Sequence, residues 1–262
     1  MITHSLHAVV LLAAVAAEPE AKKDQYPEGE RLEYRVRVKG LPGGAATLSV
    51  GRCEKTEGRE TVTLGLRMRS NAFVSKFYPI DNRWTSVLET ETGSTLSFRV
   101  DKSERRKRRI EESTIDPRTF SGSYYRREQD GRELRREFRL DGPAQDSLSL
   151  FYHVRRLPLV LGTSDSITIL YRDKAHELRL MVDGLERVSV PGVGRFWAKV
   201  VHPSVGPGLF SDKGQATLWL EEKTHAMLKL VVEAPKGSAS MTLIKVEKSP
   251  LLNAPRALGG PE

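Results

Sequence analysis

Hydrophobic and polar residues alternate along most of the chain from Glu30 onward. In RLEYRVRVK, for example, Leu32, Tyr34, Val36 and Val38 fall on one face and charged residues on the other. A period of two is typical of strands with one face in a core and the other in water. The same alternation recurs in segments 62–68, 96–100, 134–140, 167–171, 178–182, 196–200, 216–220, 228–232 and 241–243.

Turn-forming residues separate these segments. They are LPGG at 41–44, Asp-Gly pairs at 130–131 and 183–184, and PGVG at 191–194. Short strands at such spacing favour an antiparallel architecture. The sequence therefore predicts a mainly β protein: an antiparallel curved sheet of about a dozen strands, arranged as an open barrel or a sandwich.

One segment, QDSLSLFYHVRRLPL at 145–159, departs from this period and predicts one buried central helix. Asp146 is a good N-cap, and Pro158 ends the helical pattern. At 3.6 residues per turn the apolar side chains cover more than half of the circumference, so the helix packs against the sheet or fills its concave side. These side chains are Leu148, Leu150, Phe151, Tyr152, Val154 and Leu157.

Arg155 falls inside the apolar arc of this helix. A buried guanidinium needs a counter-charge, because desolvating it alone is very costly. Three alternatives follow: a structural carboxylate, which we favour with Asp81 as the expected partner; a ligand anion; or a side chain that reaches the surface. We name Arg155, Tyr152 and Asp146 as candidate ligand-binding residues.

The N-terminus resembles a secretory leader. Leu6–Ala17 is apolar, no Lys, Arg, Asp or Glu occurs before Glu18, and Ala14–Ala16 offers a small-residue cleavage site. The run is too short to span a bilayer, which takes about 20 residues, and the sequence offers no other transmembrane segment. We predict a cleaved signal peptide over residues 1–17 and export to the periplasm. Because no Lys or Arg precedes the run, a buried first helix or a misplaced start codon are the alternatives.

The remaining chain divides into three parts. We expect a flexible lead-in at 18–28, a single β-rich domain at 29–248, and a disordered tail at 249–262, which is rich in Pro and Gly. Cys53 is the only cysteine, so no internal disulfide can form, and an exported chain must be held together by its core.

The net charge is +8, and ERRKRRIEE at 104–112 concentrates five consecutive cations. One interpretation is a solvated sheet face whose charges are partly neutralised by neighbouring Glu residues. The other is a patch for anionic lipid head groups or lipopolysaccharide. Its candidate contacts are Arg105, Arg106, Arg108 and Arg109. Nucleic acid is not an expected partner, because the sequence has no zinc-finger spacing and no helix-turn-helix pattern.

Catalytic and metal-binding motifs are missing from the sequence. It contains no HExxH, GxSxG, SxxK or P-loop, and the four histidines outside the leader, His153, His176, His202 and His225, do not have the spacing of a metal pair. We therefore expect a non-enzymatic protein with no cofactor and no metal site.

Five stretches in order resemble the bacterial exported family catalogued as domain of unknown function 3108. They are GERLEYRVRVKGLPGGAATLSV, SKFYPIDNRWTSVLE, QDSLSLFYHVRRLPLVLG, VSVPGVGRFWAKVVHPSV and GLFSDKGQATLWLEEKTHAMLKLVVEA, between Gly29 and Glu247. The resemblance implies an envelope protein of mostly antiparallel β structure and brings no catalytic residues. In this family the helix carries an Arg after its Tyr, and Arg155 stands at the corresponding place. Segment 102–139 is more basic than the family, and Glu221 and Glu222 stand where it tends to have Asp.

These observations predict a non-enzymatic envelope protein that binds a lipid, a glycolipid or another anionic envelope component in a concave β face. The alternative is an envelope scaffold or assembly factor that binds a protein partner through a sheet edge. A hydrolase without a recognisable motif is the third hypothesis.

Overall fold

The computed structural model describes residues 26–56, 58–205, 215–235, 237–254 and 256. These residues form one antiparallel sheet of fourteen strands, which confirms the predicted fold class. The strands are β1 (Arg31–Val38), β2 (Leu41–Thr56), β3 (Arg59–Ser70), β4 (Asp81–Glu89), β5 (Thr95–Glu104), β6 (Lys107–Ile115), β7 (Ser121–Glu128), β8 (Glu133–Arg139), β9 (Ser164–Tyr171), β10 (Lys174–Val190), β11 (Gly194–Val205), β12 (Gln215–Glu221), β13 (Met227–Ala234) and β14 (Gly237–Glu247). The helical elements are α1 (Ala72–Ser75), α2 (Leu150–His153), and the 3-10 turns η2 (Val154–Arg156) and η3 (Pro250–Asn253).

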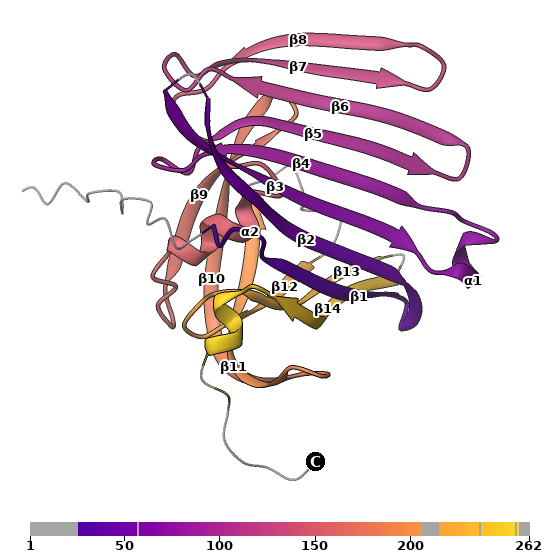
Figure 1. Cartoon of the computed structure of the whole chain (residues 1–262), viewed down its shortest axis with the longest axis vertical. Helices are drawn as coiled ribbons and strands as arrows, with labels where there is room; N and C mark the ends of the chain where they lie inside the picture. The colour runs from indigo at the N-terminus through magenta and orange to yellow at the C-terminus, as the bar shows by residue number, and fades with distance from the viewer. Residues whose placement is uncertain (1–25, 57, 206–214, 236, 255, 257–262) are drawn as a thin grey trace, which may run out of the picture.

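The sheet consists of two meanders joined at a single seam. Strands β1 to β8 follow one another on one side, β9 to β14 on the other, and β1 pairs with β14. Every neighbouring pair is antiparallel, as expected for strands joined mostly by short turns. The half β1–β8 arches over β9–β14, and α2 lies between the two halves (Figure 1).

The two ends of the sheet, β8 and β9, come close without pairing. Between them runs the chain that leads to α2: the Gln145 N–H donates to the Thr168 carbonyl at 2.8 Å, and the Leu170 N–H donates to the Gln145 carbonyl at 2.7 Å. Arg136 of β8 also pairs with Asp173 beyond β9 at 2.9 Å. The sheet is therefore an unclosed barrel whose gap is partly filled by this segment.

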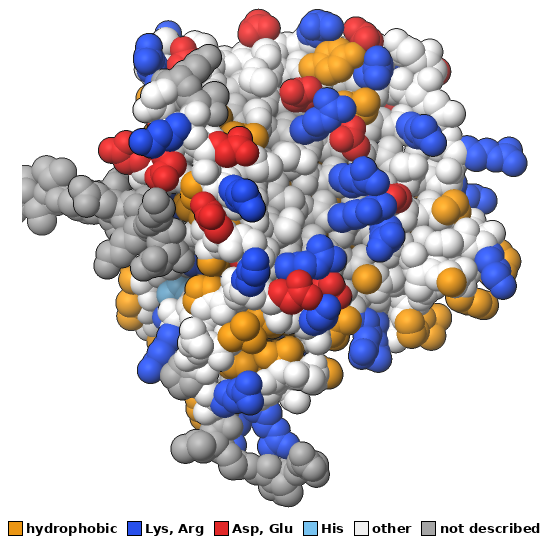
Figure 2. Space-filling view, viewed as in Figure 1, with side chains coloured by type: hydrophobic (Ala, Val, Ile, Leu, Met, Phe, Trp, Pro, Cys, Tyr) orange, Lys and Arg blue, Asp and Glu red, His pale blue; other side chains and the backbone are white. Residues whose placement is uncertain are grey.

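Alternation along the strands produces the core. Leu32 and Tyr34 of β1, Leu64 of β3, Leu180 of β10 and Phe196 of β11 all lie in one buried cluster that takes in both halves. Burial of such side chains contributes about 25 cal/mol per Å² of apolar surface. The opposite face of β1–β8 carries interspersed basic and acidic side chains (Figure 2), as the polar half of the alternation predicts.

Two of the predicted turns were wrong. The first chain reversal uses Lys39 and Gly40, both with positive φ, and LPGG at 41–44 already belongs to β2. Asp183 and Gly184 lie inside β10, where the register shifts between Val182 and Gly184. Asp-Gly forms a tight turn only if the flanking residues pair with each other, whereas here both flanks pair with β11.

The predicted ends of the domain also need correction. Tyr26, in the segment predicted as a flexible lead-in, is buried in the core cluster. Residues 249–254, predicted as the start of a disordered tail, include η3; Leu251 is fully buried, and the Ser249 hydroxyl accepts from the Leu251 N–H at 3.2 Å. The apolar side chains Leu251 and Ala254 anchor this end. The predicted signal peptide at 1–17 lies outside the described residues.

Gly44 is a position where the sheet tolerates no side chain. A Cβ atom built on Gly44 of β2 would overlap the Arg69 carbonyl of β3. We predict that Gly44→Ala lowers the free energy of unfolding by about 1–3 kcal/mol, the usual cost of overpacking. Gly184→Ala is the matched control, because a Cβ there meets no atom within 4 Å. Urea unfolding of both variants checks this, and equal effects would contradict it.

Candidate functional site

Asp146 holds the start of the segment that carries α2. Its carboxylate is fully buried: Oδ2 accepts from the Ser86 hydroxyl at 2.5 Å and the Thr95 hydroxyl at 2.9 Å, and Oδ1 accepts from the backbone N–H groups of Leu148 and Ser149 at 2.7 and 2.9 Å. Burial raises the pKa of Asp146, although these hydrogen bonds favour its charged form. Asp146 thus caps the turn at 147–149 and ties it to β4 and β5, whereas the N-cap of α2 itself is Ser149 and not Asp146 as predicted.

Arg155 holds the other end of the helical segment through a buried ion pair. Its side chain is 7% exposed, and its Nη1 and Nη2 atoms donate to Glu30 Oε1 at 3.1 Å and Oε2 at 2.9 Å. The Ser249 hydroxyl donates to the same carboxylate at 2.5 Å, and the guanidinium carbon lies 4.5 Å from the centre of the Tyr152 ring. Burial lowers the pKa of Arg155, but the Glu30 carboxylate, together with the Tyr152 and Tyr34 side chains, raises it by more, so the net pKa is raised.

The structure confirms that Arg155 pairs with a carboxylate, but the expected partner was wrong. Asp81 accepts instead from Arg67 Nε and Nη2, at 2.9 and 2.6 Å, on a half-buried part of the sheet. Glu30 was missed because it precedes the first strand. A signal was present: Glu30 stands two residues before Leu32, so the period of two puts it on the apolar face.

The helical segment is shorter and less regular than predicted. It begins with turns at Ser147–Ser149, continues as the four residues of α2, and ends as the 3-10 turn η2. Ser149 is fully buried, and its hydroxyl is satisfied there by accepting from the Asp146 N–H at 2.8 Å. Tyr152 is also fully buried, and burial raises the pKa of its phenol.

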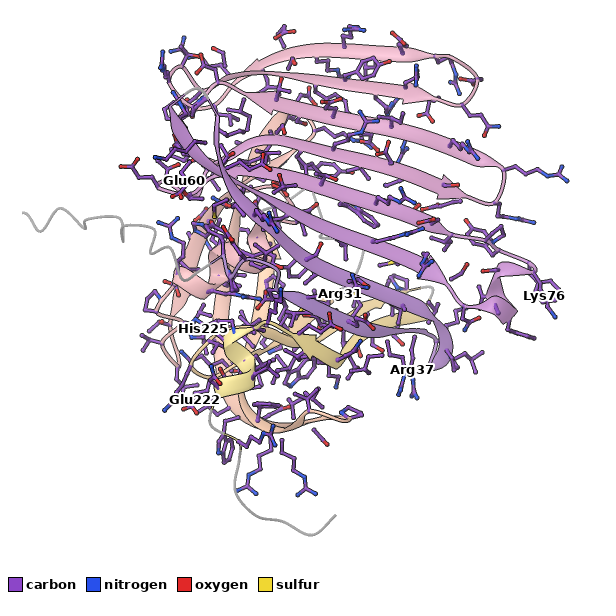
Figure 3. The ribbon with its side chains drawn as sticks, viewed as in Figure 1. Arg31, Arg37, Glu60, Lys76, Glu222 and His225 are labelled. Atoms are coloured by element: carbon purple, nitrogen blue, oxygen red, sulfur yellow. The ribbon has the colours of Figure 1, made fainter. Side chains whose placement is uncertain are left out.

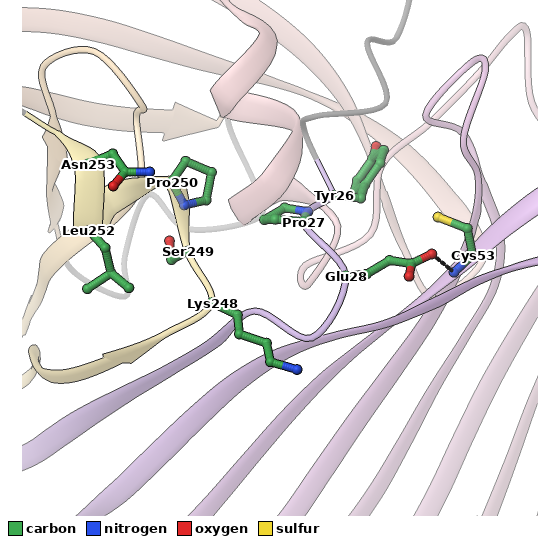
Figure 4. A pocket seen from close by; sticks show the side chains of 9 residues that line it. All are labelled: Tyr26, Pro27, Glu28, Cys53, Lys248, Ser249, Pro250, Leu252 and Asn253. Carbon is green, nitrogen blue, oxygen red and sulfur yellow. Dashed lines mark hydrogen bonds between the residues drawn. The ribbon is translucent and has the colours of Figure 1, made fainter.

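One cavity of about 770 Å³ lies where the segments before β1 and after β14 meet (Figure 4). Glu28 contributes a negative charge to its wall and Lys248 a positive one. Glu28 Oε1 accepts from the Cys53 N–H at 2.9 Å. Ser249 links this wall to the Glu30–Arg155 pair. Its mixed lining of Pro, Tyr, Leu and charged side chains shows no single chemical character.

A second cavity of about 660 Å³, the apolar groove, lies between α2 and strands β9–β13. Among the described residues that line it, Ser147, His202, Ser204 and Gln215 are polar, and Tyr171 carries a phenol hydroxyl. The other lining residues are Leu150, Phe151, Val154, Ile169, Leu170, Leu178, Leu180, Pro203, Val205, Ala216, Leu218, Leu230 and Val232. Tyr152, Arg155 and Asp146 do not line the groove. Arg155 and Asp146 instead bind other parts of the chain. That these three residues contact a ligand stays a prediction.

Two histidines have lowered pKa values: His153 lies in α2 and is partly buried, and His225 is buried. His225, on the turn between β12 and β13 (labelled in Figure 3), has its Nε2 atom 2.9 Å from Lys199 Nζ, which also donates to the Pro158 carbonyl at 3.2 Å. Burial, and then the Lys199 charge, lower the pKa of His225 to about 4. Burial and the Arg156 charge lower the pKa of His153 to about 4 as well. Both rings are therefore neutral at pH 7.

The basic run forms a hairpin end rather than a continuous sheet face. Arg105 and Arg106 make the turn between β5 and β6, both exposed, and Arg105 has a positive φ of 55°. Arg108 is exposed on β6, whereas Arg109 pairs with Glu111 at 2.9 Å. A cross-strand pair, Arg99 with Glu112 at 3.3 Å, neutralises part of the neighbouring charge.

Among the described residues, no three His, Cys, Asp or Glu side chains lie close enough together to hold a metal ion. Within the same part of the chain, no helix is both long and apolar enough to cross a membrane.

We predict that Arg155→Met destabilises the fold strongly. It leaves the Glu30 carboxylate buried without its counter-charge, which should lower the free energy of unfolding by about 3–5 kcal/mol. The double variant Glu30→Met/Arg155→Met should recover much of this loss, because no charge then remains buried. Denaturant unfolding measures both, and a loss below about 1 kcal/mol in the single variant would rule out a structural ion pair.

We also predict that the fold loses stability between pH 7 and pH 5. The unfolded chain protonates its histidines near pH 6.5, whereas folded His153 and His225 resist protonation down to about pH 4. The unfolded state therefore binds more protons in this window, so each histidine should lower the stability by about 2 kcal/mol. Unfolding at both pH values measures it. His153→Gln and His225→Gln should each flatten the pH dependence, and an unchanged slope in both would refute this origin.

One comparison with a solved structure agrees with this architecture. The structure resembles the crystal structure of a beta-barrel-like protein of domain of unknown function DUF1849 from Brucella abortus, with a TM-score of 0.52, 11% identity, and coverage of 84% of this chain and 97% of that chain. At that identity the likeness shows the fold alone. A protein with a YmcC-like fold from Bacteroides fragilis matches with a TM-score of 0.33 and 9% identity over 84% of this chain and 96% of that chain. No curated protein matches the sequence.

One protein-family model matches residues 33–244, and it is described as "Protein of unknown function (DUF3108)". The match begins in β1 and ends in β14, so it takes in the strands on both sides of the seam. This confirms the resemblance found in the sequence: the chain belongs to the DUF3108 family of proteins of unknown function.

Proposed function

We propose that this chain is an exported, non-enzymatic envelope protein that binds the acyl chain of a lipid or glycolipid in the apolar groove. The observation that carries the proposal is the lining of that groove, whose described residues are apolar except for Ser147, His202, Ser204, Gln215 and the Tyr171 hydroxyl. The leader-like residues 1–17 support export, because an apolar run followed by small residues is the pattern that signal peptidase accepts.

The size and the chemistry of the groove both suit such a ligand. A volume of about 660 Å³ lies within the range of about 300–1,000 Å³ that is usual for small-molecule sites. Leu150, Phe151 and Val154 of the helical segment form one wall and strand residues the other. An acyl chain in this space would remove apolar surface from water on both walls and on itself, which is the driving force for binding.

The polar residues of the lining offer hydrogen-bonding groups to the polar part of a ligand. His202 Nδ1 lies 3.4 Å from the Thr217 hydroxyl, and its Nε2 lies 3.5 Å from Asp183 Oδ2. Ser204 on β11 and Gln215 on β12 also line the groove, and their side chains can hydrogen-bond to a carboxyl, ester or sugar hydroxyl. Arg155 is not needed in this arrangement, because Glu30 already satisfies it.

The alternative, a protein partner on a sheet edge, has weaker support. The edge strand β8 reads ELRREFR, and five of its seven residues are exposed, charged side chains. Charged side chains are a common device that keeps edge strands from pairing with other chains. We therefore favour ligand binding in the groove over a protein partner at the sheet edge.

We predict that Val232→Trp weakens binding of a fluorescent polyene fatty acid at least about tenfold, a change of about 1.4 kcal/mol. Val232 lines the groove from β13, so the indole would occupy part of the space that the probe needs. Val231→Trp is the matched control, because neighbouring strand residues face opposite sides of a sheet. Fluorescence titration measures both.

Native material gives an independent test. Organic extraction of protein purified from its own host, followed by mass spectrometry, should release an acyl-chain compound from the wild type and much less from Val232→Trp. Equal probe affinity in the two tryptophan variants, together with no extractable lipid, would sink the proposal.

A further inference from the structure

A cluster of exposed apolar and basic side chains lies at one end of the sheet, away from the apolar groove. Phe73 and Phe77 are 71% and 68% exposed, and Leu41 and Tyr78 are exposed as well. We call this cluster, together with Lys76, Arg105 and Arg106, the aromatic tip. Figure 3 places Lys76 at the outer end of α1, and Figure 2 shows hydrophobic and basic side chains together along that edge.

The tip is built from three chain segments that hold one another. The Asn71 N–H donates to the Gly43 carbonyl at 3.0 Å, and Asn71 Nδ2 donates to the Pro42 carbonyl at 2.8 Å, so the α1 segment is fastened to the start of β2. On its other side the Arg105 N–H donates to the Pro79 carbonyl at 2.7 Å. The side chains are thus presented from a fixed platform.

The aromatic rings are positioned by contacts within the tip and still face outward. Phe73 and Phe77 meet edge to face with centroids 5.8 Å apart, and the Arg105 guanidinium lies 5.4 Å from the centre of the Tyr78 ring. The nearby carboxylates are engaged elsewhere: Asp81 with Arg67 and Arg83, and Glu104 with Asn82. The outward charge of the tip is therefore basic.

We propose that the aromatic tip docks the protein on the surface of an anionic phospholipid bilayer. Exposed apolar patches rimmed by polar groups mark interaction sites, and aromatic rings are favoured at the level of the lipid head groups. Lys76, Arg105 and Arg106 complement the phosphates of that surface. This inference is independent of the apolar groove, because the two sites share no residue.

The test is flotation of the full chain with vesicles of phosphatidylcholine alone or mixed with phosphatidylglycerol. Each cation near an anionic surface is worth about 1 kcal/mol, so Arg105→Gln/Arg106→Gln should weaken binding to the mixed vesicles roughly 30-fold at about 0.01 M salt. The difference should shrink at about 0.15 M salt, where the Debye length falls to about 8 Å. Phe73→Ser/Phe77→Ser should weaken binding at least about tenfold at both salt concentrations.

Matched controls separate the tip from general charge and hydrophobicity. Arg52→Gln/Lys174→Gln removes two exposed cations elsewhere, and Val160→Ser/Leu161→Ser removes two exposed apolar side chains elsewhere. Both should bind like the wild type, and every variant keeps the same N-terminal segment. Wild type that does not float with mixed vesicles at low salt, or tip variants that float equally well, would overturn the proposal. So would a dimer that the Phe73→Ser/Phe77→Ser variant abolishes, because the tip would then join two copies of the chain.

Discussion

The buried pair between Glu30 and Arg155 is the constraint on which the arrangement of this protein depends. Glu30 precedes β1, Ser249 follows β14, and Arg155 ends the helical segment, so the contact joins both sides of the β1–β14 seam to the element inside the sheet. Desolvating either charge alone is costly, so the three segments are stable together and not separately. The bidentate geometry also fixes the orientation of the helical segment, because a planar guanidinium matches a carboxylate in one plane.

A helix of four residues followed by a 3-10 turn has little stability of its own. It is held at both ends by charged groups inside the protein: Asp146 at its start, with four hydrogen bonds, and Arg155 at its end. Its apolar side chains pack between the halves of the sheet. Leu150, Phe151 and Val154 of this segment also line the space between it and β9–β13, which is the apolar groove.

The two proposed surfaces of the molecule follow from different levels of structure. The groove is formed by side chains on the inner face of strands far apart in the sequence, together with one helical turn. The aromatic tip is formed by α1, by turns and by the first residue of β2, where no core requires the apolar side chains that are found. Apolar residues on the inner face are explained by folding alone, whereas those on the tip are not.

The alternation of residues by itself determined the fold class, most of the strands and which side chains enter the core, because a period of two leaves one face of each strand buried. It also determined that Arg155 needs a partner, since helical geometry puts its charge among apolar side chains. Only the tertiary structure decided that the partner is Glu30, 125 residues away, because strand order and curvature bring the start of β1 to the end of η2. The same holds for the turns at Lys39–Gly40 and for the bulge at Gly184: local sequence offers several places to reverse the chain, and long-range pairing between strands selects among them.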